Sequence, residues 1–66
     1  MLKNRIKDKR EELGYSQEKA AFLVGISRNA LGSIERGEAI PSLKIAFKLS
    51  YLFKVTIEEL FYFENQ

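Results

Sequence analysis

The most regular pattern of apolar and polar positions lies in residues 16–37. Apolar residues recur there every three or four positions on both sides of Gly25, which indicates two short amphipathic helices joined by a turn. Ser16 and Ser27 stand before the two segments, and each can cap a helix by accepting a hydrogen bond from a backbone N–H. Gly25 can adopt the positive φ that a tight reversal requires. This pattern predicts a helix-turn-helix, with inward positions at Ala20, Ala21, Val24, Ile26, Leu31 and Ile34.

A helix is also predicted before this motif, in residues 4–13, and its inner face carries one charged side chain, Arg10. Arg10 has two interpretations. Its aliphatic stem could pack on the core while the guanidinium reaches water. Alternatively, it could form an ion pair with an acid from another helix, for which Glu35 is the candidate. The residues that share this face, at spacings of four, four and three, are Leu2, Ile6, Arg10 and Leu13.

Two more helices are expected in residues 42–61. Ser42 follows a proline and can cap a helix that runs to about Phe53. Thr56 and Glu59 have the spacing of a capping box, which opens a short helix through residue 60 or 61. The expected inward positions of the longer helix are Leu43, Ala46, Leu49, Ser50 and Phe53.

The aromatic segment 61–64 can be extended, and it could pair with residues 1–3 as a small two-stranded ribbon. The predicted fold class is therefore all-α. It consists of one five-helix domain over residues 1–66, with the helix-turn-helix formed by the second and third helices and this ribbon as the only strands.

Composition excludes several kinds of chemistry. The chain contains no cysteine and no histidine, so disulfides and a Cys/His metal site are excluded, and neither residue type can act as a catalytic base or nucleophile. Acid proteases and phosphatases that use carboxylates alone remain possible by composition. Glu58 and Glu59 are adjacent and would point in different directions, so we interpret them as acids in a first helical turn, where the helix dipole favours them. We expect no enzymatic activity, no metal, no cofactor and no small-molecule ligand.

The net charge of +2 is small, but the positive excess lies in the first half of the chain, where the helix-turn-helix is predicted. No apolar run approaches the roughly 20 residues that a membrane span needs. Charged side chains dominate residues 1–13, which does not fit a signal peptide. We therefore expect a cytoplasmic protein without a membrane partner.

The helix predicted at residues 28–36 has a polar outer face that would suit a DNA major groove. Gly32 lies on that face by helical spacing, although glycine costs about 1 kcal/mol of helix stability relative to alanine. Close approach to DNA would explain it, and simple tolerance is the alternative. Phe22 is expected to be partly exposed, either in ordinary packing or against DNA sugars. The outer positions are Arg28, Asn29, Gly32, Ser33 and Arg36.

A set of residues spread over positions 5–61 also matches a known pattern in register and without gaps. The set comprises Arg10, Gly14, Ser16-Gln17, Ala21, Gly25, Ile26-Ser27, Ile34-Glu35-Arg36-Gly37, Pro41-Ser42-Leu43, Val55 and Ile57-Glu58-Glu59-Leu60-Phe61. In these residues the chain resembles the helix-turn-helix family of phage repressors and Cro proteins. The resemblance implies a transcriptional regulator, typically a repressor, that binds a two-fold symmetric double-stranded DNA operator as a homodimer.

The resemblance also implies roles for individual residues. It favours the ion pair of Arg10 with Glu35, which matches an internal pair of the family. The chain departs from the family after Gly37: the loop there is often basic in the family, but here its sequence is Glu38-Ala39-Ile40. The implied base-reading residues are Arg28, Asn29 and Ser33. The expected contacts with the DNA backbone are Gln17, Ser27, Gly32, Arg36 and Lys44.

The C-terminal part has more apolar residues than one helix face needs. An exposed apolar patch commonly marks an interface, so residues 51–63 are the predicted dimerisation region. The expected interface residues are Tyr51, Leu52, Ile57 and Phe61. The alternative function is a protein-interaction module that uses the same helices, such as an antitoxin that masks a toxin.

Overall fold

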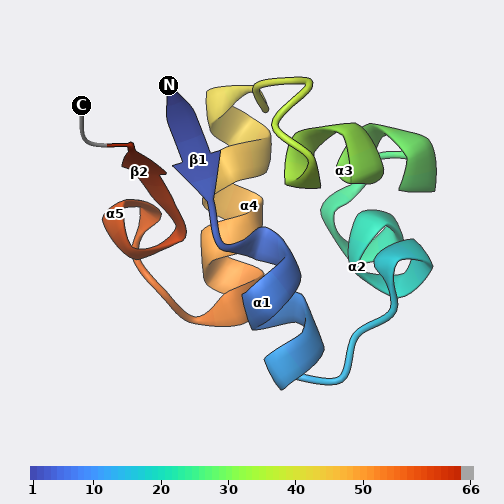
Figure 1. Ribbon diagram of the computed structural model, residues 1–66. Coiled ribbons are helices and arrows are strands. Elements are labelled where there is room, and N and C mark those ends of the chain that lie inside the picture. Colours follow the sequence, from blue (N-terminus) through green and yellow to red (C-terminus); the bar gives the residue numbers. More distant parts are fainter. Residues whose placement is uncertain (65–66) are drawn as a thin grey trace.

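In the computed structural model, which describes residues 1–64, five helices surround one core and the two ends of the chain meet in a small sheet (Figure 1). This arrangement confirms the predicted five-helix fold, the helix-turn-helix and the ribbon. The helix-turn-helix is α2 and α3, and these lie on one side of the molecule, while α5 and β2 lie on the other. The elements are β1 (Leu2–Asn4), α1 (Ile6–Glu12), α2 (Gln17–Val24), α3 (Arg28–Glu35), α4 (Leu43–Phe53), α5 (Ile57–Leu60) and β2 (Phe61–Phe63).

Local hydrogen bonds explain where four of the helices begin. Ser16, Ser27 and Ser42 each accept a hydrogen bond from the backbone N–H three residues later. The Thr56 hydroxyl accepts in the same way from the Glu59 N–H, and the Thr56 backbone N–H donates to the Glu59 carboxylate, which completes a capping box. These caps satisfy donors that the first helical turn leaves free. The four starts therefore lie where the sequence predicts them.

The helix α1 begins later than the sequence pattern indicates, at Ile6 rather than Asn4. Asn4 belongs to β1, and its side chain holds both neighbours in place. Its carboxamide oxygen accepts a hydrogen bond from the Ile6 backbone N–H at 3.1 Å, while Nδ2 donates to the carbonyl of Ile34 at 2.9 Å. Asn4 therefore ends β1, supports the start of α1 and connects this part of the chain to α3.

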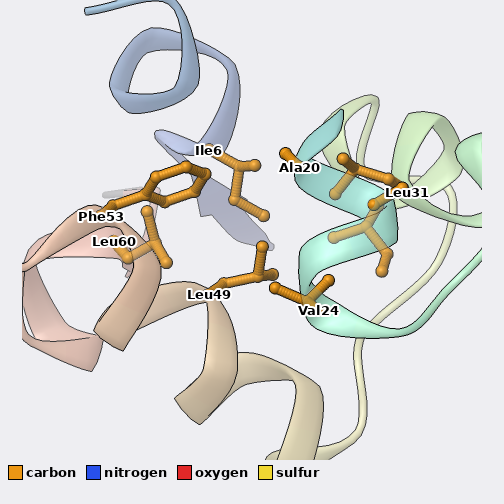
Figure 2. Close-up of a cluster of buried hydrophobic side chains, with 9 residues drawn as sticks. Ile6, Ala20, Val24, Leu31, Leu49, Phe53 and Leu60 are labelled. Carbon is orange, nitrogen blue, oxygen red and sulfur yellow. The ribbon is translucent and has the colours of Figure 1, made fainter. Parts of the chain in front are cut away.

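The core receives side chains from all five helices (Figure 2). Ile6, Leu49 and Leu60 meet from α1, α4 and α5, while α2 and α3 close the opposite side. Each large apolar side chain buried in this way contributes about 1.5–3 kcal/mol. The fully buried members are Ile6, Val24, Leu31, Leu49 and Leu60, with Ala20 and Ala21 at the helix contact.

Three expected inward positions are wrong. Leu13 and Leu43 are 51% and 71% exposed, because each lies at the end of its helix, beyond the part that crosses the core. Leu2 belongs to β1 instead of extending the apolar stripe of α1. Phe22 is exposed, as predicted.

The two termini form an antiparallel sheet in which Leu2 pairs with Phe63 and Asn4 with Phe61. The pairing continues into α1, because the Arg5 backbone N–H donates to the carbonyl of Leu60 at 2.8 Å. The Arg5 guanidinium lies 4.0 Å from the centre of the Tyr62 ring. The sheet thus joins β1 and α1 to α5.

A buried ion pair connects α1 to α3. Arg10 Nε donates to Glu35 Oε2 at 2.8 Å and Arg10 Nη2 to Glu35 Oε1 at 3.3 Å, and both side chains are about nine-tenths buried or more. A third bond runs from Arg10 Nη1 to the carbonyl of Tyr15 at 3.1 Å. The hydrogen bond and charge of Glu35 raise the pKa of Arg10, so the guanidinium stays charged. Of the two interpretations of Arg10, the structure shows the ion pair with Glu35.

Gly32 lies where α3 approaches the beginning of α2, and it is buried. It is covered by the side chains of Gln17 and Arg36, so the outer face of α3 is not open to solvent at this residue. A Cβ at this position would lie 3.1 Å from Arg36 Nη1 and 3.5 Å from Gln17 Nε2. The missing side chain thus leaves room for Gln17 and Arg36 to fold over α3.

Replacing one partner of the buried ion pair should be more destabilising than replacing both. Arg10→Met leaves Glu35 as an uncompensated buried charge, which should cost about 3 kcal/mol of unfolding free energy. The double variant Arg10→Met/Glu35→Leu should recover most of that loss in urea unfolding followed by circular dichroism. Additive losses in the double variant would contradict this account of the pair.

Gly32→Ala should leave the stability unchanged or raise it by up to about 1 kcal/mol, because alanine favours the helix and the nearest atom is the end of an exposed arginine. Thermal unfolding would measure the difference. The matched comparison is Gly37→Ala, where φ is +78° and a Cβ is strained, so this variant should be destabilised. A clear loss for Gly32→Ala would show that Gln17 cannot move aside.

Candidate nucleic-acid interface

The first turn of α3 carries two exposed polar side chains, Arg28 and Asn29. Ser33 follows Asn29 by four residues, so the two share a helix face, and Ser33 is half-buried. Leu31 and Ile34 hold the other side of α3 in the core. The structure therefore presents Arg28, Asn29 and Ser33 from a helix whose back is fixed.

Gln17, the first residue of α2, connects this surface to the buried ion pair. Its Nε2 donates to Glu35 Oε1 at 3.0 Å, and its Oε1 lies 3.5 Å from Arg28 Nη1. A carboxylate only accepts hydrogen bonds, so the amide must turn its NH₂ group to Glu35 and its oxygen to Arg28. One chain of contacts thus runs from Arg10 through Glu35 and Gln17 to Arg28.

At the other end of α3, Arg36 is paired with an acid that the sequence analysis did not assign to the site. Arg36 Nε and Nη2 lie 3.0 and 3.1 Å from the two carboxylate oxygens of Glu38, and Nη2 lies 3.5 Å from Ser33 Oγ. The hydrogen bond and charge of Arg36 lower the pKa of Glu38. In the sequence, the only indication of this pairing was that Glu38 is acidic in a loop that is often basic in the family.

A polar cleft lies between α1, the start of α2 and the end of α3. Gln17 and Arg36, which are both predicted to contact the DNA backbone, line this cleft. It also adds Lys7, an exposed residue of α1 that the sequence analysis missed, because its place beside α3 follows from helix packing. The lining residues are Lys7, Arg10, Gln17, Gly32, Glu35 and Arg36.

Two other predicted backbone contacts lie elsewhere. Ser27 is exposed and caps α3 with its hydroxyl oxygen. Lys44 is exposed in the first turn of α4 and does not line the polar cleft. In residues 1–64, no group of three or more acidic, histidine or cysteine side chains could hold a metal ion.

The four residues expected at a dimer interface have three different surroundings. Ile57 and Phe61 line an apolar groove of about 550 Å³, whereas Leu52 packs against the core. Tyr51 is 77% exposed on α4 and its ring centre lies 6.3 Å from that of Phe47. The groove is lined by Leu2, Ile40, Pro41, Leu43, Ala46, Ile57, Glu58, Phe61, Tyr62 and Phe63.

One residue of the groove, Leu43, also begins a row of exposed side chains on α4. Leu43, Phe47 and Tyr51 follow one another at spacings of four residues, so they share a face of the helix, and all three are exposed. We call the groove and this row of side chains the apolar surface. Leu43 was expected to face the core, so it was not predicted as part of this surface. Within residues 1–64, no helix has the length and apolar character to cross a bilayer.

Comparison with known proteins places these features in a family. The family model described as helix-turn-helix matches residues 6–60. The chain is 38% identical over 65 residues to the HTH-type transcriptional regulator YgzD of Bacillus subtilis, and the match covers 98% of each chain.

Two solved structures have a similar fold. The restriction-modification controller protein C.AhdI from Aeromonas hydrophila aligns with a TM-score of 0.76 at 36% identity, over 83% of each chain. The N-terminal DNA binding domain of SinR from Bacillus subtilis aligns with a TM-score of 0.73 at 37% identity, over 80% of this chain and 78% of that domain.

The match to the family model extends over α1 to α5, including the capped helices and the turn at Gly25 that define the motif in this structure. Because the model match and the full-length similarity to YgzD agree, the chain belongs to the helix-turn-helix family of DNA-binding transcriptional regulators.

Proposed function

We propose that this protein is a repressor that binds a two-fold symmetric operator as a homodimer, with α3 in the major groove. The observation that carries the proposal is the pair of exposed side chains, Arg28 and Asn29, at the start of a helix whose opposite face is buried. The N-terminal end of such a helix can reach base edges while the rest of the domain remains outside the groove. SinR, a structural relative, has been solved in complex with DNA.

Arg28, Asn29 and Ser33 read the bases. The guanidinium of Arg28 donates two hydrogen bonds to guanine O6 and N7, and the amide of Asn29 pairs with adenine N6 and N7. Ser33 lies one turn further along the helix and bonds to either kind of base. In the free protein the Arg28 Nη1 lies 3.5 Å from the side-chain oxygen of Gln17.

The polar cleft binds the DNA backbone. Gln17, Lys7 and Arg36 surround a space that a phosphate can enter, and the N–H groups at the start of α2 add to its attraction for anions. Ser27 and Lys44, which lie outside this cleft, contact other phosphates of the DNA backbone. Gly32 contributes indirectly, because its lack of a side chain lets Gln17 and Arg36 reach this cleft.

The occupant that we propose for the apolar surface is a second copy of the chain. The surface combines a groove with a row of exposed side chains, so one copy can supply both a cavity and apolar side chains to fill it. Two copies related by a two-fold axis would bury the same surface on each, as an isologous dimer requires. Dimerisation would also present two copies of α3 to a symmetric operator.

Selection from random-sequence DNA tests the function. Repeated rounds of binding and amplification, followed by gel-shift assays, should enrich an inverted repeat with half-sites about one helical turn apart. Failure to enrich any sequence, together with stable capture of a toxin-like partner, would favour the protein-interaction alternative.

Arg28→Ala should lower specificity at one base pair of each half-site. Loss of the bidentate contact should reduce discrimination at that pair by about 1–3 kcal/mol, measured by titrating the selected operator and its single-base variants. Lys44→Ala should instead weaken binding to all sequences equally, because a phosphate contact carries no base information. Equal losses of Arg28→Ala on operator and random DNA would contradict the assignment.

Leu43→Lys should weaken the dimer. Leu43 is exposed, so the fold should tolerate the change, but a charge in the apolar surface removes a burial worth about 1.5–3 kcal/mol at each contact. Sedimentation equilibrium should show a dissociation constant raised at least tenfold. Phe22→Lys is the matched control, since Phe22 is similarly exposed on α2, outside this surface. A monomeric wild-type chain at high micromolar concentration would refute the dimer.

A further inference from the structure

The loop after α3 places Glu38 beside Arg36 through backbone geometry. Gly37 has φ +78°, and its N–H donates to the carbonyl of Ile34 at 3.0 Å. The Glu38 N–H donates to the carbonyl of Ser33 at 2.9 Å. These two bonds form a Schellman motif, the usual way in which a glycine ends a helix. The position of the Glu38 backbone is therefore fixed before its side chain makes any contact.

From this position the Glu38 carboxylate occupies the side of Arg36 that carries Nε and Nη2, with distances of 3.0 and 3.1 Å. The side chains are 59% and 61% exposed, so water surrounds the pair. Exposed ion pairs contribute at most about 1 kcal/mol. The pair can therefore open when a well-placed phosphate takes the place of the carboxylate, in contrast to the buried pair of Arg10 and Glu35.

We propose that Glu38 is a specificity-determining residue that suppresses binding to non-operator DNA by competing with phosphate for Arg36. The inference rests on the DNA-binding function proposed above, and it concerns how the same interface separates operator from other DNA. Arg36 lines the polar cleft with Lys7 and Gln17, and its Nε and Nη2 are available to the DNA backbone only when Glu38 releases them.

The effect differs between the two kinds of complex. Binding to non-operator DNA depends almost entirely on phosphate contacts and the counterions they release. On an operator, the base contacts of Arg28 and Asn29 hold α3 in one register, so one phosphate stays in place to exchange with Glu38. On other DNA no register is fixed, the pair stays closed and the carboxylate repels nearby phosphates. Glu38 therefore weakens non-operator binding more than operator binding.

The test measures binding to a labelled random-sequence duplex and to the selected operator by fluorescence anisotropy over a series of salt concentrations. Glu38→Gln should bind the random duplex about three- to fivefold more tightly at low salt, the range expected from an exposed ion pair. The slope of log K against log salt should become steeper by about 0.9, the value for one additional phosphate contact. The operator should gain less, so the specificity ratio should fall.

Two comparisons separate competition for Arg36 from a general effect of charge. Asp8→Asn removes the same charge from an exposed position on α1, opposite the buried Ile6 and Arg10, and it should leave the slope unchanged. In the background of Arg36→Gln, adding Glu38→Gln should no longer steepen the slope, because the cation for which Glu38 and phosphate compete is absent.

An unchanged slope for Glu38→Gln, or an equal change in the Arg36→Gln background, would overturn the inference while leaving the DNA-binding function intact. Wild-type protein that binds neither duplex at low salt would overturn the proposed function, and the inference with it. Circular dichroism of each variant separates these outcomes from loss of the fold.

Discussion

The carboxylate of Glu35 stands where α1, α2 and α3 meet, and each of its oxygens has a partner. One oxygen accepts from Arg10 Nε, and the other accepts from Arg10 Nη2 and Gln17 Nε2. Away from water these charges need one another, because a buried ion without its partner is costly. The same group therefore determines how α3 lies against α1 and where the Gln17 amide points. The side of the molecule that we propose to face DNA depends on this arrangement.

The interface contains ion pairs of two different kinds. The pair of Arg10 and Glu35 is buried and has further hydrogen bonds to Tyr15 and Gln17, so it acts as a fixed support. The pair of Arg36 and Glu38 lies in water and has little to lose on opening. A rigid support beneath an exchangeable surface pair suits the proposed function, in which α3 stays in place while the contacts with DNA change. Gly32 serves both, since Gln17 and Arg36 meet above it.

Much of the fold and part of the site could be predicted from the sequence, because the signals are local. Serine and threonine caps act over three residues, so the starts of α2 to α5 were predicted, and Gly25 identified the turn. The ribbon was also predicted, from an aromatic segment that can be extended. The exposed positions of Arg28 and Asn29 followed from helical spacing. Their DNA contacts and the homodimer remain predictions.

The sequence alone thus determined which residues form helices and which side of α3 is polar, since both depend on neighbours within one or two turns. The tertiary structure decided how far each helix extends past the core. Leu13 and Leu43 are exposed because they lie at helix ends beyond the core. The packing of α1, α2 and α3 against one another buries Gly32 and brings Lys7 to the polar cleft. It also showed that Glu38 holds Arg36 at the end of α3. Helical spacing gives the direction of a side chain around its own axis, but only the packing of helices decides what that side chain meets.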